Sequence, residues 1–388
     1  MERKEWRFLV LGSISIFCLV LLSCIPFTRK AKSSTEQSVH AEQRESVAET
    51  GTETGNIGGE ETETVVFELP EQDRKEAKEA VWTAIENRER DYIKLPKQYY
   101  VEAAEAYLQE DYMSSRIILN FAGDFEMKYD TSSVVRTFGK KEYTGKLKPE
   151  EPLKKMELKK TKQKKGEKLQ IIFTFEKILE PVFYETEDFY YIALKNPRDV
   201  YDRILVLDAG HGGMDEGTMS ADKKDDEKTY ALSVVKKLRA MFTGKKVKVY
   251  CTRMVDMDLS KAARVGLANR LQADLFVSIQ CNAAEAWEHH IGGIEALYSN
   301  VPLKYGHLTS KALARIMLEE LSGTTSLEKR GIIDREGLYI LKNSRVPATI
   351  VEVGYMTNIS DMNFMRSEKG QELIVKGLYL GIQKALKK

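Results

Sequence analysis

The regular alternation of strand-like and helix-like segments in the C-terminal half constrains the fold of this chain most strongly. From Tyr201 onward, short apolar runs such as "RILVLDAG" and "DLFVSIQ" alternate with segments of helical spacing such as "EKTYALSVVKKLRAMF". Strands that alternate with helices favour a parallel sheet that is covered on both faces. We therefore expect residues 201–388 to form an α/β domain with a mostly parallel, twisted sheet and helices on both faces.

Residues 67–198 predict a smaller accessory domain with a helical start and a β-rich remainder. The stretch "RKEAKEAVWTAIENRERDY" has helical spacing, and "KQYYVEAAEAYLQE" predicts a second helical stretch after Pro96. From Ser115, β-branched and aromatic runs such as "RIILNFAG" and "LQIIFTFEKI" predict strands. Residues 145–168 hold ten Lys against four Glu. Such a segment is typical of a solvated hairpin, or of a patch that attracts an anionic polymer or a phospholipid surface.

The N-terminus predicts export of the rest of the chain. Residues 8–27, "FLVLGSISIFCLVLLSCIPF", are long and apolar enough for a membrane anchor, and they also resemble a signal peptide. A weak lipobox at "LLSC" leaves a lipidated Cys24 as a third alternative. Residues 28–66 are rich in Ser, Thr, Glu and Gly and predict a disordered linker. The net charge of +1 gives no reason to expect nucleic-acid binding.

Polar residues gather where the predicted strands of the C-terminal half end, which is where α/β sheets place their chemistry. His211 follows the first strand in "DAGHGG", and Glu227 lies in the first turn of the next helix. Imidazole and carboxylate groups are usual zinc donors, so the two residues suggest the start of a metal site. Taken singly, His211 is equally typical of a structural histidine, and Glu227 of a residue that favours the helix N-terminus.

A third polar residue lies within a strand that otherwise reads as core. Glu352 interrupts the apolar run "ATIVEVG". A strand that is buried on both faces offers no favourable place for an unpaired charge. Glu352 is therefore expected to be paired or functional.

Residues 203–386 resemble the zinc-dependent N-acetylmuramoyl-L-alanine amidases that carry the amidase 3 domain. The matching pieces occur in order and include "VLDAGHGG", "EKTYAL", "ANRLQADLFVSIQCNA" and "ATIVEVGYMTN". The resemblance implies Zn²⁺ as cofactor, peptidoglycan as substrate and Glu352 as the catalytic residue. It also implies His211 and Glu227 as metal ligands, with Asn282 and Arg330 in positions that bind substrate. The third ligand of the family is a histidine, and here Gln280 occupies that position.

A glutamine at the third ligand position leaves alternatives open. A neutral amide is a poorer zinc donor than imidazole, and Cys281, His289 or His290 is close enough in sequence to replace it. The favoured interpretation is a peptidoglycan amidase at an extracytoplasmic cell envelope, membrane-anchored or secreted, with residues 8–27 contacting the membrane. Residues 145–168 would then contact an anionic cell-wall polymer. One alternative is an impaired amidase-like domain that binds peptidoglycan or regulates another hydrolase, and another is a structural envelope module.

Overall fold

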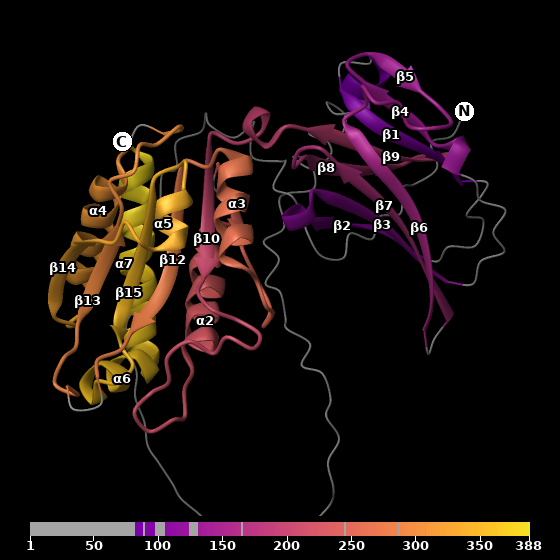
Figure 1. Cartoon of the computed structure of the whole chain (residues 1–388). Coiled ribbons are helices and arrows are strands. Elements are labelled where there is room, and N and C mark those ends of the chain that lie inside the picture. The colour runs from indigo at the N-terminus through magenta and orange to yellow at the C-terminus, as the bar shows by residue number, and fades with distance from the viewer. Residues whose placement is uncertain are drawn as a thin grey trace, which may run out of the picture.

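The C-terminal half of the chain forms a six-stranded mixed sheet with helices on both faces (Figure 1). The computed structural model describes residues 82–87, 90–97, 105–123, 131–163, 166–243, 246–285, 288–306 and 308–388. In spatial order the strands are β11 (Val247–Cys251), β10 (Arg203–Ala209), β12 (Leu275–Asn282), β15 (Ala348–Tyr355), β13 (Ile294–Tyr298) and β14 (Lys329–Asp334). Neighbouring strands are parallel except β13 and β15, which are antiparallel. The predicted α/β fold with a mostly parallel sheet is confirmed.

Side chains on the two faces of the sheet enter two separate cores. Leu205 and Leu207 of β10 face the core that α2, α4 and α7 cover, while Ile204 and Val206 face the core under α3 and α5. Burial on both faces explains why the strands read as continuous apolar runs. The helices are α2 (Glu227–Ala240), α3 (Lys261–Leu271), α4 (Ser310–Thr324), α5 (Tyr339–Asn343), α6 (Ile359–Arg366) and α7 (Glu368–Leu386).

The β-rich part of the chain consists of two antiparallel sheets packed face to face. One sheet contains, in spatial order, β5 (Lys141–Tyr143), β4 (Val135–Phe138), β1 (Asp91–Pro96), β9 (Phe189–Lys195) and β8 (Glu180–Glu185). The other contains β2 (Glu105–Asp111), β3 (Arg116–Gly123), β7 (Gly166–Phe175) and β6 (Leu153–Gln163). Short 3-10 turns lie at η3 (Tyr112–Ser114), η4 (Thr131–Ser133) and η5 (Pro197–Asp199). Residues of both sheets, such as Ile93, Leu119 and Phe173, are fully buried in the common core.

Two segments that the sequence suggested as helical are strands. Residues 82–86 are helical as expected, but Asp91–Pro96 is β1 and Glu105–Asp111 is β2. β2 pairs along its whole length with β3, and Ala106 and Leu108 pack against the core of the β-rich part. Cross-strand pairing and burial outweigh the helix propensity of Ala and Glu, which is a weak preference.

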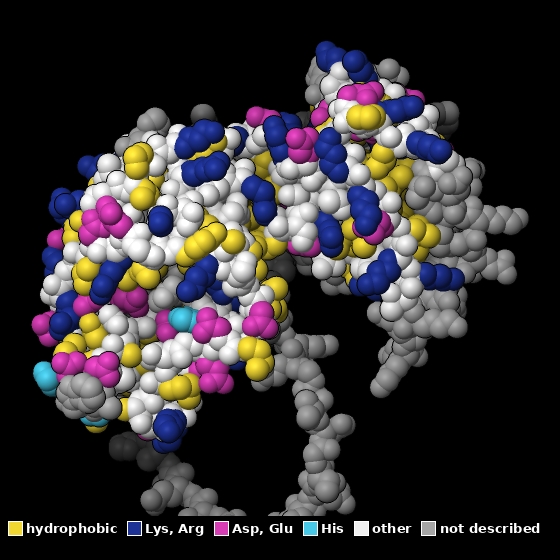
Figure 2. Space-filling model, viewed as in Figure 1, with side chains coloured by type: hydrophobic (Ala, Val, Ile, Leu, Met, Phe, Trp, Pro, Cys, Tyr) yellow, Lys and Arg dark blue, Asp and Glu magenta, His cyan; other side chains and the backbone are white. Residues whose placement is uncertain are grey.

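Most of the lysine-rich segment lies on β6 and the start of β7. These two strands pair antiparallel along a long hairpin, from Leu153 opposite Phe175 to Gln163 opposite Gly166. Figure 2 shows lysine and arginine side chains spread over the visible face of the β-rich part. β6 is the edge strand of its sheet. Lysines on an edge strand also discourage pairing with other chains, so this placement suits the plain alternative of a solvated hairpin.

A polar junction joins the β-rich part to the edge strand β11. The hydroxyl of Tyr112 donates to the carbonyl of Cys251 at 2.6 Å, and its ring lies edge-to-face against Tyr250 with centroids 5.1 Å apart. Glu180, which is 1 % exposed, accepts hydrogen bonds from Lys248 and from the hydroxyl of Tyr250. These contacts hold the two parts together on the side of the sheet where β11 lies.

The apolar segment 8–27 and the linker 28–66 lie outside the described residues. Among the residues that the structure describes, no helix is both long and apolar enough to cross a bilayer.

Candidate active site

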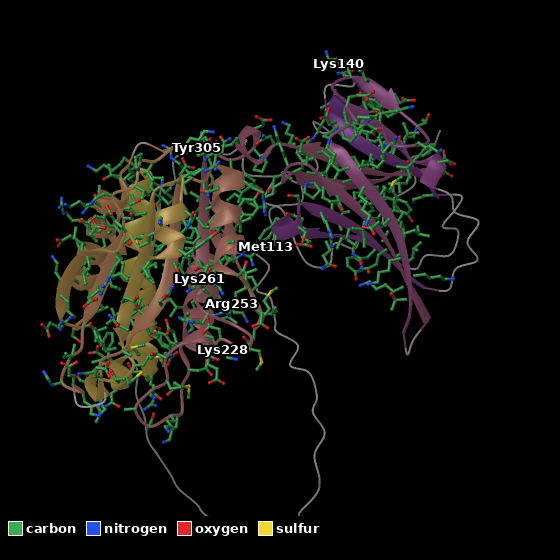
Figure 3. The ribbon with its side chains drawn as sticks, viewed as in Figure 1. Met113, Lys140, Lys228, Arg253, Lys261 and Tyr305 are labelled. Carbon is green, nitrogen blue, oxygen red and sulfur yellow. The ribbon has the colours of Figure 1, made fainter. Side chains whose placement is uncertain are left out.

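The loop that follows β10 presents His211 at the carboxyl edge of the sheet in a left-handed backbone conformation, with φ of 58°. Two buried arginines hold this loop by its carbonyl groups. Arg264 donates to the carbonyl of His211 at 2.6 Å, and Arg253 donates to Ala209 and Gly210 at 3.0 and 2.6 Å. Arg253 also bonds the carbonyl of Lys228, and Figure 3 shows these two residues next to each other beside α2. Both arginines therefore position the loop, and the strain of His211 is offset by their hydrogen bonds.

His211 and Glu227 meet at the start of α2, and we call them the donor pair. His211 Nε2 lies 3.2 Å from Glu227 Oε1, and its Nδ1 lies 2.8 Å from Asp215. A partner on Nδ1 fixes the orientation of the ring and leaves Nε2 for the site. The N-terminal cap of α2 is Asp226, whose side chain accepts from Thr229, so capping does not require Glu227.

The side chain of Glu227 is buried, with 3 % of the residue exposed, and two backbone N–H groups hold its carboxylate. Its Oε1 accepts from the backbone N–H of Cys281 and its Oε2 from that of Thr218, each at 2.9 Å. The hydrogen bond to Glu227 is the main cause that raises the pKa of His211 to about 9, with Asp215 contributing and burial opposing. Without a cation, His211 is therefore protonated at neutral pH and faces Glu227.

The donor pair has the spacing of two ligands on one metal ion. Two donors on a tetrahedral zinc ion, each about 2.0–2.2 Å from it, lie about 3.3–3.6 Å apart. The observed 3.2 Å between His211 Nε2 and Glu227 Oε1 is close to that distance. Within the described residues, no group of three His, Cys, Asp or Glu side chains is placed to hold a metal. The pair fits a shared cation.

No hydrogen bond or ion pair joins the donor pair to the side chains of Cys281, His289 or His290 among the described residues. Cys281 lies within β12 and is buried in the core under α2 and α7. His289 is exposed, with its Nδ1 3.2 Å from the carbonyl of Thr357, and His290 is exposed as well. The suggested replacement of the missing ligand by one of these residues is therefore not found. Gln280 remains the residue at the third position.

Glu352 lies on β15 directly opposite Gln280 of β12 on one side and Glu295 of β13 on the other. It is 6 % exposed, and its Oε2 has no hydrogen-bond partner among the described residues. Burial is the main cause that raises its pKa to about 8, and the charges of Glu227 and Glu295 raise it further. A buried carboxyl with a free oxygen and a raised pKa is typical of a group that transfers protons.

A buried carboxylate that the sequence interpretation missed connects the two predicted substrate-binding residues. Glu295 is 5 % exposed and accepts from Arg330 Nε and the Tyr355 hydroxyl, both at 2.8 Å, and from Asn282 Nδ2 at 3.1 Å. The signal was present in "GGIEALY", where a glutamate interrupts an apolar strand just as Glu352 does. We call these four residues the Glu295 cluster.

The predicted site residues thus form two adjacent groups at one edge of the sheet. The donor pair and Gln280 form the first group, and Glu352 separates it from the Glu295 cluster, which contains Asn282 and Arg330. Figure 2 shows a histidine flanked by acidic side chains on the surface of the α/β part.

Residues 205–384 match the family described as N-acetylmuramoyl-L-alanine amidase. The C-terminal half of the chain therefore carries a domain of this amidase family. Among curated relatives, the probable cell wall amidase LytH of Staphylococcus saprophyticus is 27% identical over 195 residues, or 49% of this chain and 62% of that protein. The germination-specific N-acetylmuramoyl-L-alanine amidase of Bacillus subtilis is 27% identical over 197 residues, or 46% of this chain and 78% of that protein. The match therefore spans less than two thirds of the first of these relatives.

A solved structure gives a match of similar extent. The catalytic domain of CwlV, an N-acetylmuramoyl-L-alanine amidase from Bacillus (Paenibacillus) polymyxa var. colistinus, is 30% identical, with 48% of this chain and 98% of that chain covered and a TM-score of 0.44. The family match begins within β10 and ends within α7, so it contains nearly all of the six-stranded sheet and every residue of the two groups described above.

Proposed function

We propose that this chain is a peptidoglycan amidase that cleaves the amide bond between N-acetylmuramic acid and L-alanine in a zinc-dependent reaction. The observation that carries the proposal is the donor pair with its 3.2 Å spacing at the same sheet edge as the buried Glu352, whose Oε2 is unpartnered among the described residues. The family match and the names of the relatives support the substrate class.

The donor pair would hold the cation together with Gln280. When bound there, zinc would lower the pKa of a water molecule and polarise the scissile carbonyl. Glu352 is the proposed general base and acid. Its Oε2 can take a proton from the attacking water and return it to the leaving amine, because no described residue forms a hydrogen bond with this oxygen.

The Glu295 cluster is the proposed contact for the substrate. The side chain of Arg330 is 33% exposed, while Glu295 and the carbonyl of Gly292 hold its Nε and Nη1. An arginine that is fixed on one side and open on the other suits an anionic or carbonyl group of the stem peptide. Asn282 is oriented by the same carboxylate, to which its Nδ2 donates.

The test uses the purified full chain and isolated peptidoglycan. Release of stem peptides with a free N-terminal alanine, measured by mass spectrometry, is the expected result. Glu352→Gln keeps the shape of the side chain and removes its proton-transfer chemistry, so release should fall at least a thousandfold while binding to peptidoglycan persists. No release from any peptidoglycan with the zinc-loaded protein would refute the proposal, and so would undiminished release by the Glu352→Gln variant.

A second candidate function is binding of peptidoglycan without cleavage, either as a receptor or as a regulator of another hydrolase. The neutral amide of Gln280 at the third donor position favours it, because a weakly held cation supports little turnover. This candidate predicts co-sedimentation with peptidoglycan, no peptide release, and no effect of Glu352→Gln on the bound fraction. Activity that appears only in Gln280→His would favour it over the amidase proposal.

The proposed location is the extracytoplasmic cell envelope, with residues 8–27 as an anchor or export signal. The relatives that are described as cell wall amidases support this location. The lysine-rich hairpin of β6 and β7 is the proposed contact for an anionic wall polymer. Retention on cell walls that keep or lack teichoic acid tests this contact. Equal retention on both preparations would contradict it.

A further inference from the structure

The orientation of the Gln280 amide follows from a buried hydrogen-bond relay behind it. Asp208, at the end of β10, is fully buried. Its Oδ1 accepts from Thr252 at 2.6 Å and from Arg264 at 2.8 Å, and its Oδ2 accepts from Ser278 at 2.7 Å. Ser278 in turn lies 3.2 Å from the side-chain amide of Gln280.

The number of hydrogen-bond donors in this relay decides which end of the Gln280 amide faces Ser278. A serine hydroxyl has a single hydrogen, and an ionised carboxylate only accepts. The hydrogen of Ser278 is therefore committed to Asp208, and its oxygen can only accept from Gln280. The group that faces Ser278 must be the amide nitrogen Nε2, which turns the amide oxygen Oε1 the other way. No residue that the structure describes donates a hydrogen bond to this oxygen.

Gln280 lies next to two residues, Gly210 and Cys281, that adjoin the donor pair. Its side chain packs on Gly210, the residue before His211, so closely that a Cβ there would come within 2.6 Å of Gln280 Cγ. The next residue, Cys281, donates its backbone N–H to Glu227 Oε1 at 2.9 Å. Gln280 is thus adjacent to the loop of His211 and to the backbone group that holds the Glu227 carboxylate.

We propose that the relay of Asp208 and Ser278 holds Gln280 as an oxygen donor, so that this chain has a cation site of one nitrogen and two oxygens. The inference rests on the proposed function only in that both place a divalent cation at the donor pair. Replacing an imidazole by an amide oxygen lowers zinc affinity, because imidazole is the better zinc donor. Carbonyl and carboxylate oxygens suit Mn²⁺, so the preference for Zn²⁺ over Mn²⁺ becomes smaller.

The test measures binding of Zn²⁺ and Mn²⁺ to the metal-free full chain by isothermal titration calorimetry, with no substrate present. Gln280→His should increase the ratio of Zn²⁺ to Mn²⁺ affinity at least tenfold over the wild-type ratio. A ratio that does not change would overturn the inference. Peptide release by the wild type is measured separately, so a failure of the proposed function is distinguishable from a failure of this inference.

A matched pair of variants tests the relay itself. Ser278→Ala and Thr252→Val each remove one hydroxyl that donates to Asp208, but only Ser278 also accepts from Gln280. Ser278→Ala should weaken Mn²⁺ binding by about 10-fold or more, within the range of 10–100-fold known for residues that orient metal ligands. Thr252→Val should stay within about twofold of the wild type, which is well below that range. Equal effects of the two variants, or no effect of Ser278→Ala in a protein that remains folded by circular dichroism, would refute the role of the relay.

Discussion

Replacing Glu352 by glutamine is expected to stabilise the cation-free protein while it stops hydrolysis. Burial and the charges of Glu227 and Glu295 raise the pKa of Glu352 from 4.5 to about 8. A carboxyl whose pKa is higher in the folded than in the unfolded state binds its proton more tightly when folded. Below pH 4.5 both states are protonated and the folded state carries no penalty. As the pH rises from 4.5 to 8, the unfolded chain ionises first and the folded state loses relative stability.

The size of the effect follows from the same two pKa values. Each pH unit between them corresponds to about 1.4 kcal/mol, so the interval sets a ceiling of about 5 kcal/mol at pH 8. Local relaxation around a buried charge reduces this figure, and we expect a gain of about 2–5 kcal/mol for Glu352→Gln. For a domain of this size, about 2–4 °C in Tm accompanies each kcal/mol, which gives roughly 4–20 °C. At pH 5 the gain should nearly vanish.

The assay is thermal unfolding of the chelator-treated full chain, followed by circular dichroism at pH 5 and pH 8. Glu151→Gln is the matched control, because Glu151 is equally buried but accepts from Arg136 at 2.7 and 3.1 Å. Removing that partner leaves a buried guanidinium unpaired and should destabilise the protein by about 3–5 kcal/mol. A Tm for Glu352→Gln that equals the wild type at both pH values would refute the reasoning, and so would a gain of equal size at pH 5.

Substitutions at three other residues test contacts at the candidate site and at the junction with β11. Glu295→Gln should raise KM for soluble muropeptides about tenfold with a smaller change in kcat, since Arg330 loses a charged acceptor. Steady-state kinetics check this, and an unchanged KM contradicts it. Tyr112→Phe removes the hydroxyl that donates to the carbonyl of Cys251 at 2.6 Å and accepts from its N–H at 3.3 Å. The loss of about 1 kcal/mol should lower Tm by about 2–4 °C in thermal unfolding, while a loss of the fold would show a different role. Gly217→Ala should weaken zinc binding at least tenfold in calorimetry, because its methyl group would lie 2.6 Å from an oxygen of the donor pair. Gly139→Ala, at a similar φ but with nothing within 4 Å, should leave binding unchanged, and equal losses in the two variants would contradict the steric reason.

The fold of the C-terminal half could be predicted because its strands are buried on both faces. That burial requires unbroken apolar runs in the strands. In the helices between them, apolar residues recur every three to four positions, so the two kinds of element are distinct in the sequence. The segments that form β1 and β2 could not be predicted in the same way. Their Ala, Glu and Tyr residues are compatible with a helix, and only pairing with β3 and β9 makes them strands.

The candidate site was partly predictable because its polar residues interrupt apolar strands or follow them directly. Glu352 was found by this argument, and Glu295 could have been found by it. The relay behind Gln280 was not predictable, since Asp208 and Ser278 are ordinary residues within two different strands and Thr252 follows a third. Only the parallel register of β10 with β11 and β12 brings them within hydrogen-bonding distance.

The relay also explains why a glutamine can occupy this position without disturbing the rest of the site. The oxygen of Ser278 needs an N–H donor from residue 280, and both a glutamine amide and a histidine ring can provide one. The exchange therefore keeps the inner hydrogen bond and alters only the atom that faces the cation, from a ring nitrogen to an amide oxygen. Proton transfer is assigned to Glu352, which lies on the neighbouring strand. Gln280 should therefore change which cation binds and how tightly it binds. Proton transfer by Glu352 should be unaffected whenever a cation is bound.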